Sequence, residues 1–373
     1  MILVIADDFT GAAEMAGICM GYGLRALICT DKWVPADTDV LILSTNSRSM
    51  DKAEALKFVG EITRAAAAMR PAFVYKKIDS VLRGHVADEL LAQMEILGLH
   101  KAVIVPANPS LGRTISGGKY FIDGTEIAAT AFAKDPEFPV PSSEAKDMLG
   151  IPGANLLKRG DPIPEGLNIA ETETAEDAGY WASQLDPDCF PAGSGDLFDA
   201  LLQQRYKKID LQNTPRPLTP HLYVSGTSFA TSRERIRQYG RAFTVFISAE
   251  LMAKAGLSGE WLKEAGAVLH RHQKLIIAFD DSITGSNFDA VVLRNKMAEY
   301  VKAVVDGFQI RELFVEGGAT AATIFRLLGI QSFEPVYEWT RGVVQMKTGA
   351  LSCIVKPGSY GLPETVKDLY GMW

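Results

Sequence analysis

The chain has 373 residues, of which 47% are hydrophobic and 22% are charged, and its formal net charge is −7. This composition is typical of a globular protein. An acidic chain without a basic block is a poor candidate for binding nucleic acid, because phosphate binding depends on Lys and Arg. No apolar run reaches the roughly 20 residues that cross a bilayer. The four cysteines form no C-x-x-C pair, which argues against a zinc site or a disulfide framework and favours a reducing cytoplasm.

Short apolar runs alternate with longer amphipathic segments in the first third of the chain. The apolar runs predict strands at residues 2–6, 26–29, 40–43, 73–75 and 102–105. The amphipathic segments predict helices at residues 11–20, 52–69 and 86–97. Such alternation is typical of a mainly parallel sheet covered by helices, and strands that are apolar throughout are expected to be buried on both faces.

Residues 106–166 differ from this pattern, because Gly and Pro are frequent there. We expect long loops with short strands at residues 120–122 and 126–127. Long loops within a compact domain are often functional. Helical patterns return at residues 174–184 and 197–206.

Residues 210–220 contain three prolines and no periodic apolar face, so they are the predicted linker. Beyond the linker, the patterns predict strands at residues 221–224, 244–247, 275–279 and 313–315, and paired strands at 343–347 and 351–355. They predict helices at residues 232–239, 260–270, 289–305 and 319–328. The sequence therefore predicts an α/β protein of two domains, residues 1–209 and 221–373, with mainly parallel sheets and an interdomain cleft.

Two adjacent carboxylates, Asp7 and Asp8, stand between the first predicted strand and the first predicted helix. Asp8 or Thr10 could cap that helix by accepting a backbone N–H. Capping does not need both aspartates, and a carboxylate at the end of a strand can also accept a hydroxyl hydrogen bond, take a proton or hold Mg²⁺. We therefore predict Asp8 and Asp7 as catalytic residues.

A second polar cluster, Lys77, Asp79, Ser80 and Arg83, directly follows the strand predicted at residues 73–75. Arg presents a planar fork that matches a carboxylate or a phosphate, and a helix N-terminus favours an anion. The alternative interpretation is a solvated turn in which Asp79 pairs with Arg83.

Two further arginines stand in polar loops. Arg48 follows the strand predicted at residues 40–43, and Arg113 lies in the Gly-containing segment 106–118. A single loop arginine is usually just exposed. Arg48 is a stronger candidate than a lone arginine, because the loops that follow parallel strands open at one edge of a sheet. Arg113 is a candidate because the backbone N–H groups of a loop such as 106–118 can approach an anion.

Three polar glycine turns follow predicted strands in the second half, at residues 224–228, 315–321 and 355–361. Backbone amides at such turns can cradle phosphates. The phosphate-binding loop G-x-x-x-x-G-K-[ST] and the dinucleotide fingerprint G-x-G-x-x-G are both absent. The glycine turns are therefore the candidate nucleotide site.

These segments resemble, in the same order along the chain, the motifs of the four-carbon acid sugar kinases, which include D-threonate, D-erythronate and 3-oxo-tetronate kinases. The resemblance is carried by ADDFTGA at 6–12, KIDSVLRG at 77–84 and the segment 106–118, and then by residues 193–197, 224–228, 317–320 and 356–361. The chain departs from the family pattern at Ala319, where the family has Glu, at Val81 (Thr) and at Pro357 (Ser).

The resemblance implies an ATP-dependent kinase that uses Mg²⁺ and phosphorylates a hydroxyl of a four-carbon sugar acid. The N-terminal domain would bind the acid and the C-terminal domain the nucleotide. Together with the polar clusters, it predicts acid contacts by Asp8, Arg48, Lys77, Ile78, Asp79, Ser80, Arg83 and Arg113. It predicts ATP contacts by Ser225, Ser228, Gly317, Gly318, Ala319, Thr320, Gly358 and Gly361.

In this hypothesis, Arg48, Lys77 and Arg83 hold the carboxylate of the acid, and Asp8 or Asp7 orients the accepting hydroxyl and takes its proton. The expected partners are small molecules, without nucleic acid or membrane, and the chain could assemble as a homo-oligomer. The alternatives are an enzyme of another class, such as a dehydrogenase or aldolase for a hydroxy acid, and a two-lobed sensor of sugar acids. The missing dinucleotide fingerprint argues against the dehydrogenase.

Overall fold

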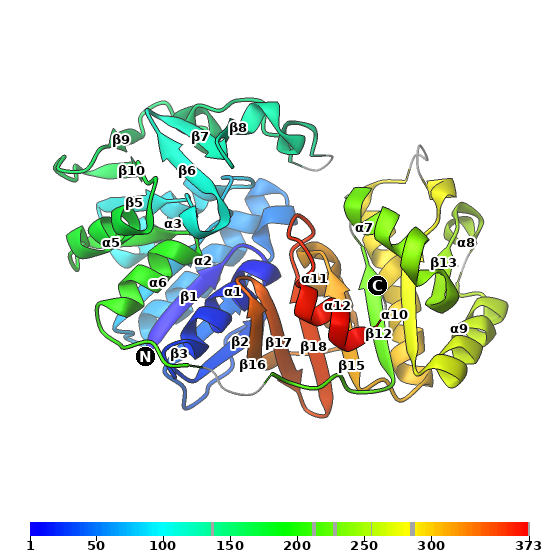
Figure 1. Cartoon of the computed structure of the whole chain (residues 1–373). Helices are drawn as coiled ribbons and strands as arrows, with labels where there is room; N and C mark the ends of the chain where they lie inside the picture. Colours follow the sequence, from blue (N-terminus) through cyan, green and yellow to red (C-terminus); the bar gives the residue numbers. More distant parts are fainter. Residues whose placement is uncertain (136–137, 211–213, 227–229, 255, 284–287, 372–373) are drawn as a thin grey trace. The chain divides into compact units, whose positions relative to one another are not determined.

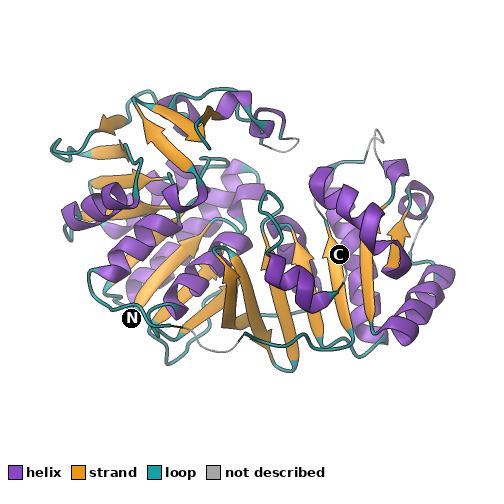
Figure 2. Ribbon diagram, viewed as in Figure 1, coloured by secondary structure: helices purple, strands orange, loops and turns teal. Residues whose placement is uncertain are grey.

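The computed structural model describes residues 1–135, 138–210, 214–226, 230–254, 256–283 and 288–371. The chain divides into two compact units, unit 1 (Met1–Asp210) and unit 2 (Leu211–Trp373). Each unit contains a mainly parallel sheet and helices packed on it, as Figure 1 and Figure 2 show. The predicted α/β class is therefore confirmed, whereas the roles of the two domains and the cleft between them stay predictions.

The strands of the main sheet of unit 1 all run parallel, in the order β2-β3-β1-β4-β11-β5-β10-β9. Their bounds are β1 Ile2–Ala6, β2 Ala26–Thr30, β3 Val40–Ser44, β4 Phe73–Lys77, β5 Lys101–Val105, β9 Asn155–Leu157, β10 Gly166–Ala170 and β11 Cys189–Gly193. The first five strands agree with the sequence prediction to within two residues at each end.

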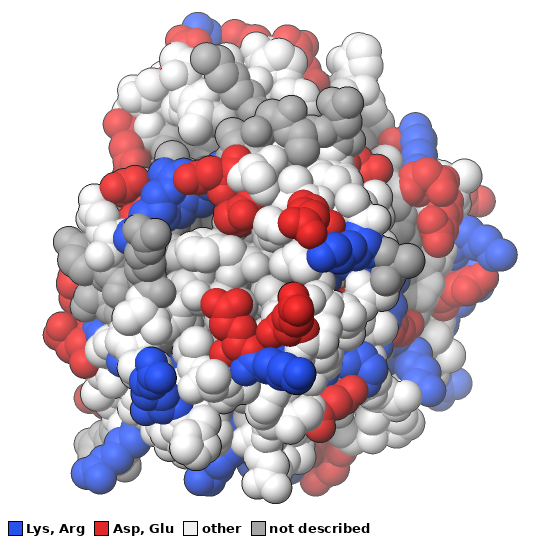
Figure 3. All heavy atoms as spheres, turned by 90° about the vertical axis from the view of Figure 1, so that its right-hand side faces the viewer, with Lys and Arg blue, Asp and Glu red and all other residues white. Residues whose placement is uncertain are grey.

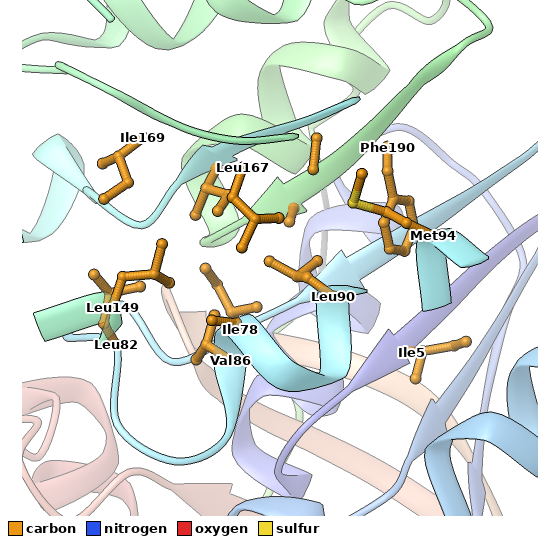
Figure 4. Packing of buried hydrophobic residues seen from close by; sticks show 14 of the residues in the cluster. Ile5, Ile78, Leu82, Val86, Leu90, Met94, Leu149, Leu167, Ile169 and Phe190 are labelled. Atoms are coloured by element: carbon orange, nitrogen blue, oxygen red, sulfur yellow. The ribbon is translucent and has the colours of Figure 1, made fainter. Parts of the chain in front are cut away.

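Helices lie on both faces of this sheet. They are α1 Phe9–Met20, α2 Lys52–Ala68, α3 Val86–Leu97, α4 Ala145–Leu149, α5 Ala175–Gln184 and α6 Gly195–Gln203. Successive side chains of a strand point to opposite faces. Lys76 of β4 pairs with Glu89 of α3, and Lys77 pairs with Glu14 of α1, so α1 and α3 cover opposite faces. Figure 4 shows part of the apolar core on the α3 face.

Within residues 106–166, the two short strands predicted at 120–122 and 126–127 are confirmed to within one residue, and a third strand that was not predicted precedes them. A small antiparallel sheet forms from β6 Arg113–Ser116, β7 Lys119–Ile122 and β8 Thr125–Glu126. Gly117 and Gly118 join β6 to β7 with φ values of +57° and +80°. Positive φ at both central residues is what a two-residue hairpin turn requires, so the Gly-Gly pair was a usable signal for this hairpin.

The sequence patterns also missed β9, β10 and β11. Strand β11 has the sequence CFPAG, in which Pro191 and Gly193 lower strand propensity. It pairs with β5 along its whole length but with β4 only at Ala192 and Gly193. Pro191 is tolerated because it lies where the strand pairs on one side only.

The sheet of unit 2 has the order β13-β14-β12-β15-β18-β17-β16. Its strands are β12 His221–Ser225, β13 Thr244–Ile247, β14 Lys274–Phe279, β15 Glu312–Glu316, β16 Ser332–Thr340, β17 Val343–Thr348 and β18 Leu351–Lys356. The predicted pairing of β17 with β18 is confirmed. Both pairs formed by β17 are antiparallel, and the remaining described pairs of this sheet are parallel. Strand β16, which contains Pro335, was not predicted.

The helices of unit 2 are α7 Ala230–Arg235, α8 Ala249–Ala253, α9 Gly259–His272, α10 Ala290–Gly307, α11 Gly318–Leu327 and α12 Glu364–Tyr370. The helix predicted at residues 232–239 ends as α-helix at Arg235 and continues as a π-helical turn, Ile236–Gly240. The short helices α8 and α12 were not predicted, because a single amphipathic turn or two gives little periodicity to detect.

Across the described part of the chain, every helix is too short or too polar to span a membrane. The thiols of Cys19, Cys29, Cys189 and Cys353 are buried and unbridged. On the face drawn in Figure 3, acidic and basic side chains are interspersed among larger areas of uncharged residues.

Candidate active site

The strand order of unit 1 reverses between two neighbouring strands. The chain leaves β1 through α1 toward β2 on one side, and it leaves β4 through α3 toward β5 on the other side. Ligands of open α/β sheets bind at such a reversal, outside the carboxyl ends of the strands. The residues that follow β1, β3 and β4 therefore form the candidate site of unit 1. They include the predicted Asp7, Asp8, Arg48 and Asp79.

Asp8 is the N-cap of α1, so the capping interpretation is confirmed. Its Oδ1 accepts the Gly11 N–H at 2.8 Å, and its Oδ2 accepts the Thr10 hydroxyl at 2.6 Å. Capping does not exhaust this carboxylate, because Oδ2 also accepts from Arg48 Nη1 at 3.2 Å. The Asp8 side chain is 12% exposed against 4% for Asp7, which makes Asp8 the more accessible of the two.

Arg48 draws three carboxylates together. It lies in a 3₁₀ turn, Ser47–Ser49, after β3. Its Nε and Nη2 contact Asp7 Oδ2 at 2.9 and 2.8 Å, and its Nη1 lies 3.5 Å from Asp79 Oδ1 in addition to its contact with Asp8. Gly84 makes room for this side chain: its φ is +89°, and a Cβ there would lie 2.9 Å from Arg48 Cγ. Arg48 therefore joins the ends of β1, β3 and β4.

The alternative interpretation of the second cluster, an Asp79–Arg83 pair, is correct about the pairing and wrong about the solvation. Arg83 Nε and Nη2 contact the two oxygens of Asp79 at 2.7 and 3.0 Å, and both side chains are largely buried. Arg83 Nη1 also contacts Asp135 at 3.0 Å. Burial alone would raise the pKa of Asp79, but the charges of Arg48 and Arg83 hold it far below its usual range.

The ring of Phe132 packs against two of the arginines that were predicted to bind the acid. The guanidinium groups of Arg83 and Arg113 lie 5.4 and 5.7 Å from its ring centroid, within the range of cation–π contact. The Nη1 of Arg113 donates to the Ser80 hydroxyl. The structure thus places the predicted Ser80, Arg83 and Arg113 side by side.

Lys77 lies on the α1 face of the sheet, beside Asp8. A Cβ at Gly11 would lie 2.9 Å from Lys77 Nζ and 2.7 Å from Asp8 Oδ1, so both groups crowd this glycine. Lys77 Nζ donates to the Ile78 carbonyl at 3.0 Å and lies 3.5 Å from Glu14 Oε2. Ile78 was predicted as an acid contact, but its side chain belongs to the apolar core and only its backbone faces the cluster.

Four residues that contact this cluster were not singled out in the sequence: Glu14, Asn108, Phe132 and Asp135. Asn108 donates to Glu14 Oε1 at 3.3 Å, which extends the cluster toward the end of β5. Glu14 had a usable signal, because it is a lone charge in the otherwise uncharged helix FTGAAEMAGICM. Phe132 and Asp135 had none, since they lie in the long connection after the β6–β8 sheet.

The pKa values of the two adjacent aspartates are shifted in opposite directions. Burial, the largest effect, raises the pKa of Asp7, and the charge of Arg48 only partly opposes it. Burial also acts on Asp8, but the charges of Arg48 and Lys77 outweigh it, so the pKa of Asp8 is lowered. No donor among the described residues contacts Asp7 Oδ1. Asp7 therefore takes up a proton more readily than Asp8.

Unit 2 has the same kind of reversal. The chain leaves β12 through α7 toward β13, and it leaves the neighbouring β15 through α11 toward β16 on the opposite side. Ser225 ends β12, and Gly317, with φ +106°, is the N-cap of α11. No side chain in the described part of the chain caps α11, so the N–H groups of its first turn, which include Gly318, Ala319 and Thr320, are oriented for an anion.

Close packing at this end of unit 2 depends on a glycine. A Cβ at Gly226 would overlap the side chain of Thr320, which is buried. Gly358 and Gly361 lie in the loop after β18, where Gly358 is half-buried and Gly361 exposed. Ser228 lies outside the described residues.

The chain matches known proteins over nearly its whole length. The sequence model of a sugar-binding N-terminal domain matches residues 2–156. A D-threonate kinase from Cupriavidus necator is 38% identical over 411 aligned residues, covering 96% of this chain and 94% of that protein. A 3-oxo-tetronate kinase from Brucella melitensis is 34% identical, covering 96% and 92%.

The fold is also found among solved structures. The crystal structure of the Haemophilus influenzae protein HI1011 superposes with a TM-score of 0.73 and covers 99% of both chains at 18% identity.

Proposed function

The chain belongs to the family of four-carbon acid sugar kinases, and we propose that it transfers the terminal phosphoryl group of ATP to a hydroxyl of a four-carbon sugar acid. As a member of this family it is a kinase. The proposal extends to the substrate, which we infer to be a threonate, an erythronate or a 3-oxo-tetronate. One observation carries it beyond the family relationship, namely the buried cluster of carboxylates and guanidinium groups at the strand reversal of unit 1.

We assign the acid to unit 1 on the basis of its side chains. A sugar acid offers one carboxylate and several hydroxyls, so it needs cations and hydrogen-bond acceptors at short range. The cluster supplies both, with Arg83 and Arg113 above Phe132 and with Asp8 beside Lys77. We propose that Arg83, Arg113, Lys77 and Arg48 hold the carboxylate end.

Asp8 is the better of the two candidates for contacting the accepting hydroxyl. It is the more exposed carboxylate, and its Oδ1 accepts only one hydrogen bond in the described part of the chain. Its lowered pKa makes it a weak base, but phosphoryl transfer through a loose transition state depends mainly on orientation and charge neutralisation. We propose that Asp8 orients the hydroxyl and receives its proton, and that Asp7 holds Arg48 in place.

We assign ATP to unit 2 on the basis of its backbone. The uncapped start of α11 can present the N–H groups of Gly318, Ala319 and Thr320 to phosphates. Among the described residues no three His, Cys, Asp or Glu side chains gather as a metal site. Mg²⁺ is usually bound by one or two carboxylates together with substrate phosphates, so we propose that it arrives with ATP and neutralises phosphate charge.

The test is ADP release from ATP and Mg²⁺ with a panel of four-carbon acids, each measured against a reaction without acid. We expect acid-dependent ADP formation with at least one of D-threonate, D-erythronate and 3-oxo-tetronate, and a phosphorylated acid by mass spectrometry. Thermal stabilisation by an acid without any ATP turnover would instead support a sensor.

A further inference from the structure

One buried carboxylate connects three segments of unit 2. Glu316 ends β15, and its side chain is completely buried. Its Oε2 accepts the hydroxyls of Tyr223 and Ser225, both at 3.1 Å, and its Oε1 accepts the Ser232 hydroxyl at 2.5 Å. Lys356 Nζ lies 2.7 Å from the same Oε1. The donors come from β12, α7 and β18, so one side chain joins elements that are far apart in sequence.

The ammonium group of Lys356 is fully used inside the protein. Its side chain is completely buried, and besides Glu316 it donates to the carbonyls of Pro357 at 2.9 Å and Tyr360 at 2.6 Å. An ammonium has three N–H donors, so this set leaves none for a phosphate. Lys356 therefore tethers the loop after β18 and is not placed to contact a ligand itself.

The same pair sets the position of the predicted ATP-binding turns. Glu316 is followed directly by Gly317 and α11, and Ser225 by Gly226. The Gly226 N–H donates to the Glu316 carbonyl at 3.2 Å, and the Gly317 N–H donates to the Lys356 carbonyl at 2.9 Å. One of the three turns therefore follows Glu316 itself, and the other two follow Ser225 and Lys356, which its carboxylate contacts.

We infer that the buried Glu316–Lys356 pair is a positioning device, which holds the turns after β12, β15 and β18 in the arrangement that binds the phosphates of the nucleotide. This inference rests on the proposed binding of ATP by unit 2. Neither side chain touches the nucleotide. Both act through the backbone that they fix.

The effect of this pair on nucleotide binding can be measured separately from its effect on the stability of the fold. Removing one member of a buried ion pair leaves an uncompensated charge and is strongly destabilising, whereas replacing both members by uncharged groups of similar size is often tolerated. The test variant is therefore Glu316→Gln combined with Lys356→Met. The Gln side chain retains hydrogen-bonding groups for the three hydroxyls, and the Met side chain fills the space of the lysine stem without tethering the loop.

A matched control exists in unit 1. Lys76 and Glu89 form another ion pair whose side chains are 0% and 2% exposed. The double variant Lys76→Met with Glu89→Gln makes the same chemical change within unit 1. Calorimetric titration with MgADP, thermal melting and steady-state kinetics are measured for wild type and both double variants.

We expect the Glu316/Lys356 variant to melt close to wild type, to bind ADP about 10-fold more weakly and to show a similarly raised KM for ATP, as expected when one or two charged hydrogen bonds are weakened. Its KM for the acid should not change. The Lys76/Glu89 control should bind ADP like wild type. A merely structural pair would alter melting without this separation of the two KM values.

The outcomes distinguish this inference from the proposed function. If wild type binds ADP and the folded Glu316/Lys356 variant binds it equally well, the positioning role is wrong and the kinase proposal stands. If wild type binds no ADP, the proposed binding of nucleotide fails, and the inference fails with it. Should the double variant not fold, Ser232→Ala removes one support without touching a charge, and an unchanged ADP affinity in that variant overturns the inference.

Discussion

The two units share the same reversal of strand order but carry different chemical groups at that point. In both, a strand and its neighbour send the chain in opposite directions, β1 and β4 in unit 1, β12 and β15 in unit 2. In unit 1 this point is filled with charged side chains, and Arg48 alone reaches three carboxylates. In unit 2 the charges are buried and internally paired, and glycine turns remain at the reversal.

Under the proposed assignment of ligands, the strand reversal fixes where each site lies, and the local sequence decides which ligand it binds. Side chains can discriminate the hydroxyls of a small acid, because each donor and acceptor has a fixed position. Backbone amides suit phosphates, which are alike in every nucleoside triphosphate. Four experiments, in order of decreasing expected effect, would break or sharpen this contrast.

Asp8→Asn tests whether charge matters in unit 1 beyond capping. Asn caps a helix as well as Asp does, so the variant should fold normally while losing the anion. We expect kcat to fall about 100-fold or more, the scale for a positioned acid–base group. Asp51→Asn is the matched control, because Asp51 also caps a helix but lies exposed at the start of α2. A folded Asp8→Asn enzyme with normal kcat would remove Asp8 from the mechanism.

Gly226→Ala tests whether backbone geometry matters in unit 2. The new methyl group would overlap the Thr320 side chain, so the turn or the start of α11 must move. We expect a loss of about 2 kcal/mol in the free energy of unfolding, typical of overpacking, and a raised KM for ATP. Gly259→Ala is the control, since nothing lies within 4 Å of a Cβ there. Equal melting and equal KM in the two variants would contradict the close packing.

Arg83→Ala tests the anchoring of the acid. The variant loses one arginine that lies over Phe132, while Asp79 keeps its contact with Arg48. We expect KM for the acid to rise about 10-fold with little change in kcat, because uniform binding is removed. Arg25→Ala serves as the control, since Arg25 is exposed and pairs with Asp37 at the surface. A normal KM for the acid in folded Arg83→Ala would dismiss the anchoring role.

Acid stability should also distinguish the units. His221 at the start of β12 is buried, and no described residue bonds either ring nitrogen. Burial, with a further effect of Lys274, lowers its pKa from 6.5 to about 4. The unfolded chain therefore takes up a proton that the folded chain refuses, so stability is full above pH 6.5 and falls progressively toward pH 4.

We expect the melting temperature to fall by about 4 °C between pH 7 and pH 5, corresponding to roughly 1–2 kcal/mol. His221→Phe should flatten this dependence, because an aromatic ring can keep the edge-on contact with Tyr370 without titrating. His270→Phe, on the exposed face of α9, should not. In unit 1 the pKa values of Asp8 and Asp79 are lowered, so the stabilisation from these carboxylates is lost only below their ordinary range near pH 4. Identical pH profiles for wild type and His221→Phe would rule out this origin.

Much of the fold was predictable where strands are short, apolar and flanked by turn residues. Strands such as β1 and β14 satisfy the pattern by themselves, because burial on both faces demands apolar residues at every position. Strands β11 and β16 did not, because each contains a proline and is held as a strand by its neighbours in the sheet. Their local propensity argues for the opposite structure.

The candidate site, like the fold, could be predicted from the sequence only in part. Asp7, Asp8, Lys77 and Arg83 could be found from sequence, because polar residues directly after apolar strands need an explanation. That Arg48 reaches all three aspartates could not be found, since it depends on β3 and β4 both lying beside β1. Phe132 and Asp135 join the site from a connection that carries no periodic pattern.

The amino-acid sequence by itself determined the α/β class, the two-part organisation and the edge of each sheet on which polar residues gather, because these depend on local patterns of burial. Only the tertiary structure decided which charges neutralise one another, that Glu316 and Lys356 are sealed inside unit 2, and that Ile78 points into the core. Pairing between side chains depends on distances across the sheet, and such distances come from strand order, which is not a local property of the chain.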